Sequence, residues 1–112
     1  MREDGKIDYV EFPAKDLPAV KAFYAAAFGW RFVDYGPDYA AFEDAALDGG
    51  FSARPDEPRP LVILYAHDLE AMEVKVKAAG GVVVREIFSF PGGRRFHFRD
   101  PAGNVLAAWT AA

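Results

Sequence analysis

The chain contains no cysteine, which excludes a disulfide framework, a thiolate metal site and a cysteine nucleophile. It has no apolar run near the about 20 residues that cross a bilayer, and its first residues lack the apolar segment of a secretory signal. We therefore expect a cytoplasmic protein with no membrane partner. Basic residues are also few, because 13 Lys and Arg stand against 17 Asp and Glu, a net charge of -4. Such a balance does not attract a polyanion, so nucleic acid is not an expected partner.

Apolar residues are abundant by comparison. They make up 52% of the 112 residues, and charged residues make up 27%, which is ordinary for a globular protein and argues against disorder. This length is enough for one well-formed core. The composition therefore predicts a single domain, residues 1–112.

An internal repeat organises this domain. A shift of 52 residues places residues 9–30 over residues 61–82 without a gap. The matched pairs include Val10 with Val62, Ala14 with Ala66, Asp16 with Asp68, Leu17 with Leu69, and Gly29 with Gly81. Self-similarity at one fixed offset is the mark of a duplicated supersecondary unit. We predict a first module of about residues 6–54, a Pro-rich linker at 55–60 and a second module of about residues 61–110.

The first module begins with a predicted strand over residues 7–12, ended by Pro13. Asp16 is a suitable N-cap for a helix that runs to Phe28 and stops at Gly29. Apolar residues at helical spacing are expected to form one core-packing stripe: Leu17, Val20, Phe23, Tyr24, Ala27 and Phe28. Strands are then predicted over residues 30–35, 39–43 and 51–54.

The second module repeats this order. A strand is predicted over residues 61–65, and a helix follows Asp68 with Leu69, Met72, Val76 and Ala79 on its apolar stripe. Glycines at 80–81 stop the helix, and strands are predicted over residues 82–90, 94–99 and 105–110. The turns between them fall at residues 91–93 and 100–104. The pattern predicts strand-helix-strand-strand-strand twice, an α+β fold with helices on one face of the sheet.

The sequence resembles the vicinal oxygen chelate superfamily, which includes glyoxalase I, bleomycin-resistance proteins and extradiol dioxygenases. The resemblance rests on VEFPAKDLPAVKAFYAAAFGW, which begins at Val10, on AAGG at residues 78–81 and on RDPAGNVLAAW at residues 99–109. It covers nearly the whole chain, and these blocks also resemble those of a large group of small bacterial glyoxalase-like proteins. It implies two tandem βαβββ modules that form a cupped, eight-stranded mixed sheet with the helices on its outer face.

The resemblance also implies where a metal would bind. In metal-dependent members, His or Glu side chains of the first and last strands of each module hold a divalent ion. These positions fall here on Tyr9, Leu61, Ala107 and the segment 50–52, which contains no ionisable side chain. Leucine and alanine cannot bind a metal, and a lone tyrosine is not a typical ligand for Mg, Mn, Zn or Ni. We therefore predict no metal site and no cofactor, and we do not expect metal-dependent glyoxalase or dioxygenase chemistry.

Strand alternation nominates the side chains of the cup. Glu11 and His97 are the predicted catalytic residues, because either one can act as a general acid or base when burial shifts its pKa. The predicted ligand-binding residues are Tyr9, Glu43, Tyr65, Arg95, Arg99 and Trp109. Aromatic walls with a few converging polar groups are typical of a small-molecule pocket.

Simpler interpretations stand beside this one. His97 can be a solvated strand histidine, and Glu11 can pair with an arginine across the sheet. Tyr9, Tyr65 and Trp109 can belong to the core or to a dimer interface. The consecutive arginines at positions 94 and 95 can be a solvated strand end.

Three functions follow from these alternatives. The first is a metal-free binding protein for a small organic or aromatic molecule, acting as a homodimer. The second is a lyase or isomerase that uses Glu11 or His97, without a metal or with a divalent metal at a displaced site. The third is a dimeric scaffold whose open sheet face is covered by its partner. The missing metal ligands favour the first function.

Overall fold

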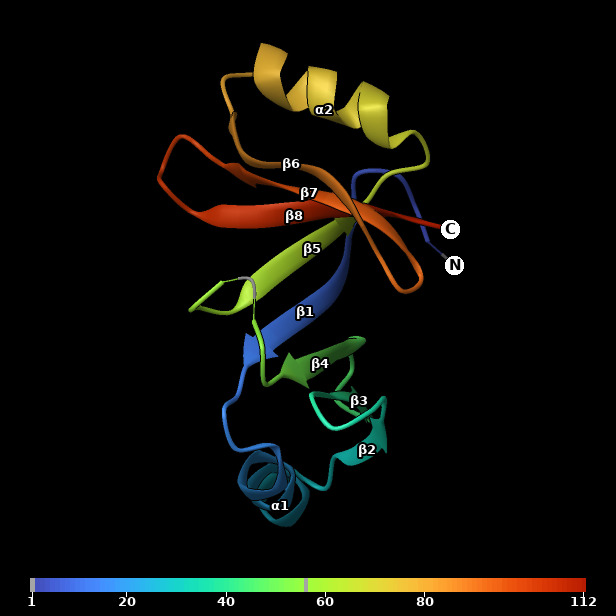
Figure 1. Ribbon diagram of the computed structural model, residues 1–112, viewed down its shortest axis with the longest axis vertical. Helices are drawn as coiled ribbons and strands as arrows, with labels where there is room; N and C mark the ends of the chain where they lie inside the picture. The colour runs from blue at the N-terminus through green and yellow to red at the C-terminus, as the bar shows by residue number, and fades with distance from the viewer. Residues whose placement is uncertain (1, 56) are drawn as a thin grey trace. The chain divides into compact units, whose positions relative to one another are not determined.

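The computed structural model describes residues 2–55 and 57–112. Its elements are β1 (Ile7–Pro13), α1 (Leu17–Phe28), β2 (Arg31–Asp34), β3 (Tyr39–Glu43), β4 (Gly49–Ser52), β5 (Leu61–Tyr65), α2 (Leu69–Ala78), β6 (Val82–Phe90), β7 (Gly93–Arg99) and β8 (Val105–Ala111) (Figure 1). The predicted α+β fold of two βαβββ modules, with an eight-stranded mixed sheet, is confirmed. Contacts divide the chain into a first unit, residues 9–61, and a second unit, residues 2–8 together with 62–112.

The first unit is a four-stranded sheet in the order β2-β3-β4-β1, in which β1 and β4 are parallel and the other pairs antiparallel. Helix α1 begins where the Asp16 carboxylate accepts a hydrogen bond from Ala19 N at 3.1 Å, and it ends at Gly29, whose φ of 75° suits a left-handed C-cap. Its core joins α1 to one sheet face and contains Ala14, Leu17, Phe42 and Phe51, with Phe12, Val20, Tyr24, Trp30 and Phe32 packed around them.

The predicted stripe of α1 was wrong at three positions, because Phe23, Ala27 and Phe28 are exposed. Phe23 is 58% exposed and Phe28 is 63% exposed, and their rings lie against each other with centroids 6.2 Å apart. Helical spacing assigns both side chains to the apolar side, but it does not report how far the sheet extends beneath the helix. Leu17, Val20 and Tyr24 are the members of the stripe that reach the core.

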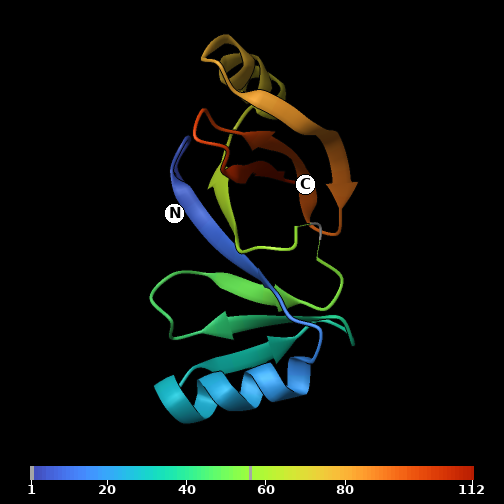
Figure 2. The same cartoon turned by 90° about the vertical axis from the view of Figure 1, so that its left-hand side faces the viewer.

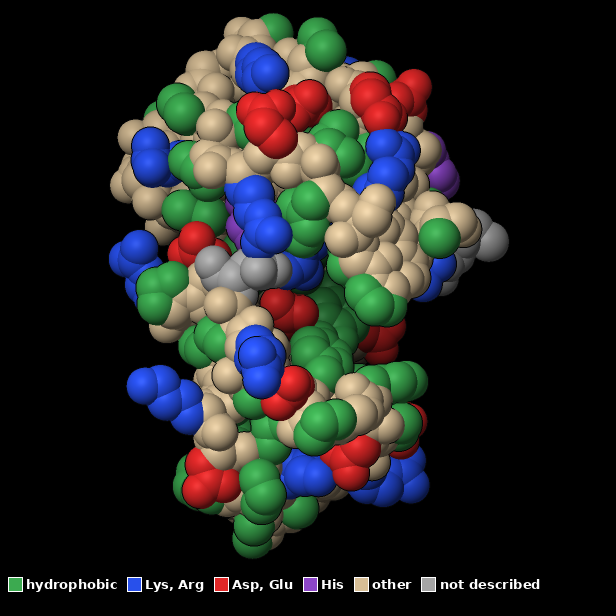
Figure 3. All heavy atoms as spheres, in the orientation of Figure 1, with side chains coloured by type: hydrophobic (Ala, Val, Ile, Leu, Met, Phe, Trp, Pro, Cys, Tyr) green, Lys and Arg blue, Asp and Glu red, His purple; other side chains and the backbone are tan. Residues whose placement is uncertain are grey.

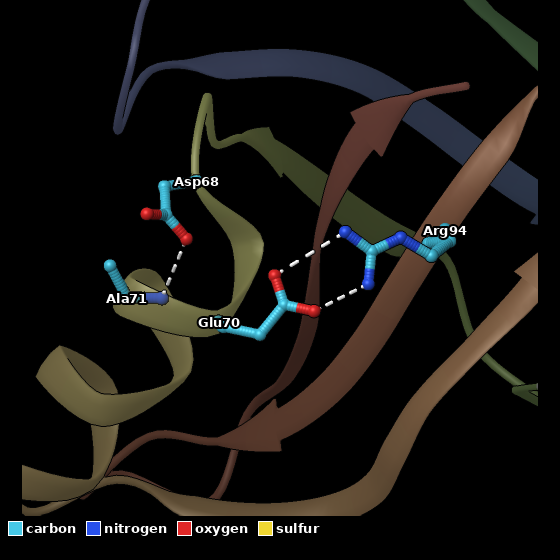
Figure 4. A network of polar contacts seen from close by, with 4 residues as sticks. All are labelled: Asp68, Glu70, Ala71 and Arg94. Atoms are coloured by element: carbon cyan, nitrogen blue, oxygen red, sulfur yellow. Dashed lines mark hydrogen bonds and ion pairs between the residues drawn. The ribbon is translucent and has the colours of Figure 1, made fainter.

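The second unit has the strand order β5-β8-β7-β6, with β5 and β8 parallel and the other pairs antiparallel (Figures 1 and 2). Asp68 caps α2 by accepting from Ala71 N at 3.0 Å, and Glu70 pairs with Arg94 across to β7 (Figure 4). The core between α2 and the sheet contains Ala66, Leu69, Phe96, Phe98 and Ala108, with Leu64, Met72, Val76, Val83, Ile87 and Leu106 around them. The predicted orientation of Phe96 and Phe98 toward the helix is confirmed.

Three glycines predicted in turns, Gly49, Gly50 and Gly93, belong to strands instead, while residues 91–92 form the predicted turn. Strand β4 begins at Gly49, two residues before the predicted start at position 51, and β7 begins at Gly93. A Cβ on Gly49 would overlap the Val10 carbonyl, and one on Gly93 would overlap the Thr110 carbonyl. These glycines therefore allow two backbones to approach closely, a role that resembles a turn signal in sequence.

The loop at residues 100–104 is a turn, as predicted. The Asp100 carboxylate accepts hydrogen bonds from the backbone N–H of Ala102 and Asn104, each at 2.9 Å, and from the Asn104 amide at 3.0 Å. In the part of the chain that the structure describes, no helix is long and apolar enough to span a membrane.

Candidate functional site

The predicted site residues are divided between the two units, and all lie on strands, on the face turned away from the helix of their own unit. In the first unit, Tyr9 and Glu11 lie on β1, and Tyr39 lies two strands away on β3. The hydroxyls of Tyr9 and Tyr39 are 2.6 Å apart, and Tyr39 also forms a side-chain hydrogen bond with Glu11. A phenol has one proton to donate. If Tyr39 donates to the Glu11 carboxylate, Tyr9 must donate to Tyr39, and the three groups form a chain.

Burial shifts the pKa values of both tyrosines in this hydrogen-bonded group. It raises the pKa of Tyr39 well above the usual value of 10.0, and the negative charge of Glu11 raises it further. Burial also raises the pKa of Tyr9, while its hydrogen bond with Tyr39 acts in the opposite direction. Both tyrosines are therefore neutral hydrogen-bond donors at pH 7.

Gly50 leaves space for the Tyr39 side chain in this hydrogen-bonded group. It pairs with Glu11 across β1 and β4, and a Cβ there would lie 2.5 Å from the Tyr39 hydroxyl oxygen and 2.7 Å from its ring. The Tyr39 ring can lie against β4 only because position 50 has no side chain. Sequence reasoning missed Tyr39, although it shares the alternation parity of Glu43 on the same strand and could have been nominated with it.

Glu43 itself lies at the end of β3, where it is exposed and stands opposite Arg31 on β2. Arg31 in turn pairs with the neighbouring Asp44 at 2.8 Å. Glu43 shares a sheet face with Tyr39, but it lies four residues farther along the strand, among solvated charges.

In the second unit, Arg95 and His97 lie on β7, and Arg95 is directly opposite Trp109 on β8. The Arg95 guanidinium is 5.4 Å from the centroid of the Phe88 ring and 5.3 Å from that of Phe90. The His97 ring meets Phe88 edge-on at 5.6 Å. Basic side chains are thus interleaved with aromatic rings on this face, a combination that favours cation–π contacts.

The burial of His97 and Arg95 shows whether these side chains are solvated strand residues, as the simpler interpretation proposed. His97 is 2% exposed and Arg95 is 7% exposed, so neither is a solvated strand residue. The solvated interpretation is wrong for both, and it holds only for Arg94, which points to the helix side and pairs with Glu70. Arg99 is exposed at the end of β7, opposite Val105, away from the Phe88 ring that His97 and Arg95 share.

Tyr65 and Trp109 meet an N-terminal segment that no motif had singled out. The Trp109 indole Nε1–H donates to Asp8 at 2.9 Å, and the Arg2 guanidinium lies 4.8 Å from the Trp109 ring centroid and 5.8 Å from that of Tyr65. Asp8 and Trp109 are 101 residues apart in the chain. No local sequence signal joins residues at that separation.

The positions that hold a metal in relatives do not fit a metal in this chain. Leu61 and Ala107 are buried apolar side chains, and the Tyr9 hydroxyl is engaged with Tyr39. Among residues 2–55 and 57–112, no three His, Asp or Glu side chains are gathered in a group that could hold an ion. The donor set at these positions lacks the three or four oxygen or imidazole ligands that a divalent metal requires.

A family model for the glyoxalase/bleomycin resistance protein/dioxygenase superfamily matches residues 6–108. The chain belongs to this superfamily. No curated protein matches the sequence.

Solved structures place this superfamily member among proteins of different activities. An NAD-dependent benzaldehyde dehydrogenase structure from Legionella pneumophila aligns with a TM-score of 0.76 at 15% identity, covering 93% of this chain and 98% of the other. Methylmalonyl-CoA epimerase from Mycobacterium tuberculosis aligns with a TM-score of 0.71 at 16% identity, covering 96% of this chain and 88% of the other. Both likenesses show the fold alone.

A Mn(II)-bound glyoxalase from Novosphingobium aromaticivorans is 30% identical, with a TM-score of 0.68 over 98% of this chain. The superfamily member spans only 40% of the length of that glyoxalase. The likeness therefore concerns one part of a longer chain.

Charge is distributed without a dominant sign on the face shown in Figure 3, where basic (blue) and acidic (red) side chains are interspersed.

Proposed function

We propose that the second unit binds a small organic molecule that carries an aromatic ring and a negative charge, and that binding needs no metal ion. The observation that carries this proposal is the position of Arg95 beside the Phe88 and Phe90 rings, on the sheet face away from α2. A guanidinium can hold a carboxylate through two parallel hydrogen bonds, and the neighbouring rings can stack on an aromatic ligand.

The composition of the two faces of the same strands supports this proposal. The face toward α2 is apolar, with Phe96 and Phe98 in the core. The opposite face places Arg85 3.6 Å from the Phe88 centroid, next to His97. A face that served only for packing would not need basic groups among its rings, whereas recognition of an organic anion uses both.

A thermal-shift screen tests the proposal. Aromatic carboxylates are compared with the corresponding uncharged amides, using protein treated with EDTA. A carboxylate at about 100 times its Kd should stabilise the fold by about 2.7 kcal/mol, which raises Tm by about 10 °C in a domain of this size. The shift should vanish in Arg95→Gln and persist in the matched control Arg94→Gln, because Arg94 lies on the helix side of the strand.

Three results would contradict the proposal. They are the absence of a shift with every carboxylate, an equal shift with the amides, and dependence of the shift on added metal. Equal loss in Arg95→Gln and Arg94→Gln would also count against it, because a charge change alone would then explain the result.

We propose proton transfer by a lyase or isomerase as a second candidate function, favoured by the hydrogen bond between Glu11 and Tyr39 in the first unit. A carboxylate oriented by a neutral phenol is suited to remove a proton from an acidic C–H bond. His97 is the other predicted acid–base residue, and its burial on β7 is compatible with that role.

Deuterium exchange into a substrate tests the proposed proton-transfer activity. One structural neighbour is a methylmalonyl-CoA epimerase in complex with methylmalonyl-CoA, so this thioester serves as the probe. Incubation in D2O should replace its acidic C–H proton by deuterium, detected by NMR. Glu11→Gln should abolish the exchange if Glu11 is the base, and His97→Asn should abolish it if His97 is. Exchange no faster than without protein would rule out this reaction.

We also propose a homodimer, which the scaffold alternative requires. It is supported by large apolar side chains exposed in the first unit, including Phe23, Phe28 and Tyr35. Light scattering at micromolar concentration should give twice the monomer mass, and a monomer mass would contradict both the dimer and the scaffold.

A further inference from the structure

A second recognition element lies in the second unit, beside the residues of the proposed anion site. The Trp109 and Tyr65 rings meet nearly at right angles, with an interplanar angle of 79° and centroids 5.6 Å apart. The Arg2 guanidinium lies over both rings, at 4.8 Å and 5.8 Å from their centroids, and 3.9 Å from the Asp8 carboxylate. A cation is thus seated in a corner of two rings and a carboxylate.

The carboxylate is fixed in place by the indole. Asp8 accepts the Trp109 Nε1–H at 2.9 Å, so its charge is held at the edge of the ring while the cation lies over the face. The face of an aromatic ring is the negative region of its quadrupole and the edge is the positive one. Both contacts therefore use the ring in its favourable direction, and rings with a nearby anion are what organic cations need for binding.

Arg2 can leave this corner without unfolding the segment that carries it. Residues 4–6 are anchored to the second unit by backbone hydrogen bonds, from Gly5 N to Tyr65 O at 2.8 Å and from Tyr65 N to Lys6 O at 3.0 Å. Asp4 adds a bond from His67 N at 2.8 Å. Arg2 lies beyond these anchors, and its side chain is 53% exposed. Its guanidinium contacts with the two rings and with Asp8 hold it in this corner.

We propose that Trp109, Tyr65 and Asp8 form a binding site for an organic cation of the guanidinium or alkylammonium class, and that Arg2 is its intramolecular occupant. The site differs from the proposed anion site in the charge that it selects and in its use of Asp8 and Arg2 rather than Arg95. Replacement of Arg2 opens the site to a free cation. The wild-type protein binds the same cation more weakly because Arg2 competes with it.

NMR of the Trp109 indole N–H tests the proposal, with tetramethylammonium as the probe and tert-butanol as an uncharged control of similar size. In Arg2→Ala the indole resonance should shift saturably with tetramethylammonium. In the wild type the affinity should be about tenfold lower, the factor that corresponds to a cation–π contact of about 1.4 kcal/mol. Adding Asp8→Asn to Arg2→Ala should lower the affinity for tetramethylammonium by at least the same factor of about ten.

Lys6→Ala is the matched control, because it removes one positive charge from the same segment, at an exposed position. It should bind the probe as weakly as the wild type does. The proposal is overturned if the Arg2→Ala resonance does not move, if tert-butanol moves it equally, or if Lys6→Ala gains as much affinity. Arg95→Gln should leave cation binding intact, so failure of the anion site and failure of this site are separate results.

Discussion

The two units are alike on their helix sides and different on the opposite sides. On the helix side, Leu17 and Leu69 are buried at equivalent positions of the repeat, and Asp16 and Asp68 cap the two helices in the same way. On the opposite side, the first unit carries two phenols and a carboxylate, whereas the second carries arginines and a histidine among aromatic rings.

This difference separates what the fold requires from what it leaves open. A helix must bury its apolar stripe on a sheet, so the side chains between them are constrained in both copies. The opposite face is free of that requirement and can diverge. The paired positions Tyr9 and Leu61 illustrate this, because one hydrogen-bonds to Tyr39 and the other is a buried aliphatic side chain. The predictions below probe the two kinds of face in turn.

The largest effect is expected on the helix side. Phe96 is fully buried against α2, so Phe96→Ala should lower the free energy of unfolding by about 3–5 kcal/mol. Phe51→Ala in the first unit should lower it by a similar amount, because Phe51 is also buried in its helix-side core. Urea denaturation measures both. A loss below about 1 kcal/mol in either variant would show that the two cores are not equivalent.

A smaller effect is expected beneath the tyrosine pair. Gly50→Ala places a methyl group against the Tyr39 ring, which must move away from Tyr9, and should lower the free energy of unfolding by about 1–3 kcal/mol. In a Tyr39→Ala background the same change should be nearly neutral, because the ring is gone. Urea denaturation of the four proteins gives the coupling, and additive losses would show that Tyr39 does not lie over Gly50.

Alkaline pH should weaken the first unit through the same tyrosines. Their folded-state pKa values are raised, so the folded state holds protons that the unfolded state releases above about pH 10. The stabilisation is therefore complete below about pH 10 and is lost as the pH rises further. Tyr39→Phe should flatten this decline, whereas Tyr35→Phe, at an exposed position, should change it much less, because the charge of Tyr35 is the smallest of the causes that raise the pKa of Tyr9. Urea denaturation between about pH 8 and 11 measures the slope, and equal slopes in all three proteins would be inconsistent with a proton held by Tyr39.

The smallest effect is expected at the exposed ion pairs that each unit carries. Arg94 holds the pKa of Glu70 below its usual range, so this pair stabilises the fold above the unfolded pKa of Glu70, and its contribution is lost as the pH falls through the folded value. Solvent and salt screen it strongly. Glu70→Gln should cause a small loss in the free energy of unfolding, measured by urea denaturation, and this loss should disappear in high salt. Asp34→Asn, which removes the pair with Lys21, should have the same small, salt-dependent effect. A large or salt-independent loss in the free energy of unfolding would contradict the prediction that these exposed pairs contribute little.

Much of the fold could be predicted from the sequence because its signals are local. The caps at Asp16 and Asp68, the stop at Gly29 and the limits of β3, β5 and β6 all follow from residues within one or two turns of chain. The errors arose where a local signal had two meanings. Gly49 and Gly93 were interpreted as turns although they allow close backbone contacts, and Phe23 was assigned to a core that does not reach it.

The candidate site was predicted less completely. Alternation correctly placed Glu11, Arg95 and His97 on the sheet faces away from the helices, since parity is a local property of a strand. It did not show that His97 and Arg95 are buried, because burial depends on the strands and loops that surround them. It also missed the partner of Glu11, Tyr39, which lies two strands away in the sheet.

By itself, the sequence determined the repeat, the order of strands and helices, the membership of the superfamily and the apolar residue types of Leu61 and Ala107, where the resemblance implies metal ligands. These depend on residue type and spacing along the chain. Only the tertiary structure decided that Tyr39 joins Glu11 to Tyr9, and that Arg2 and Asp8 close on Trp109. The reason is physical: such contacts join residues that strand pairing brings together from distant parts of the chain, and no local preference records that pairing.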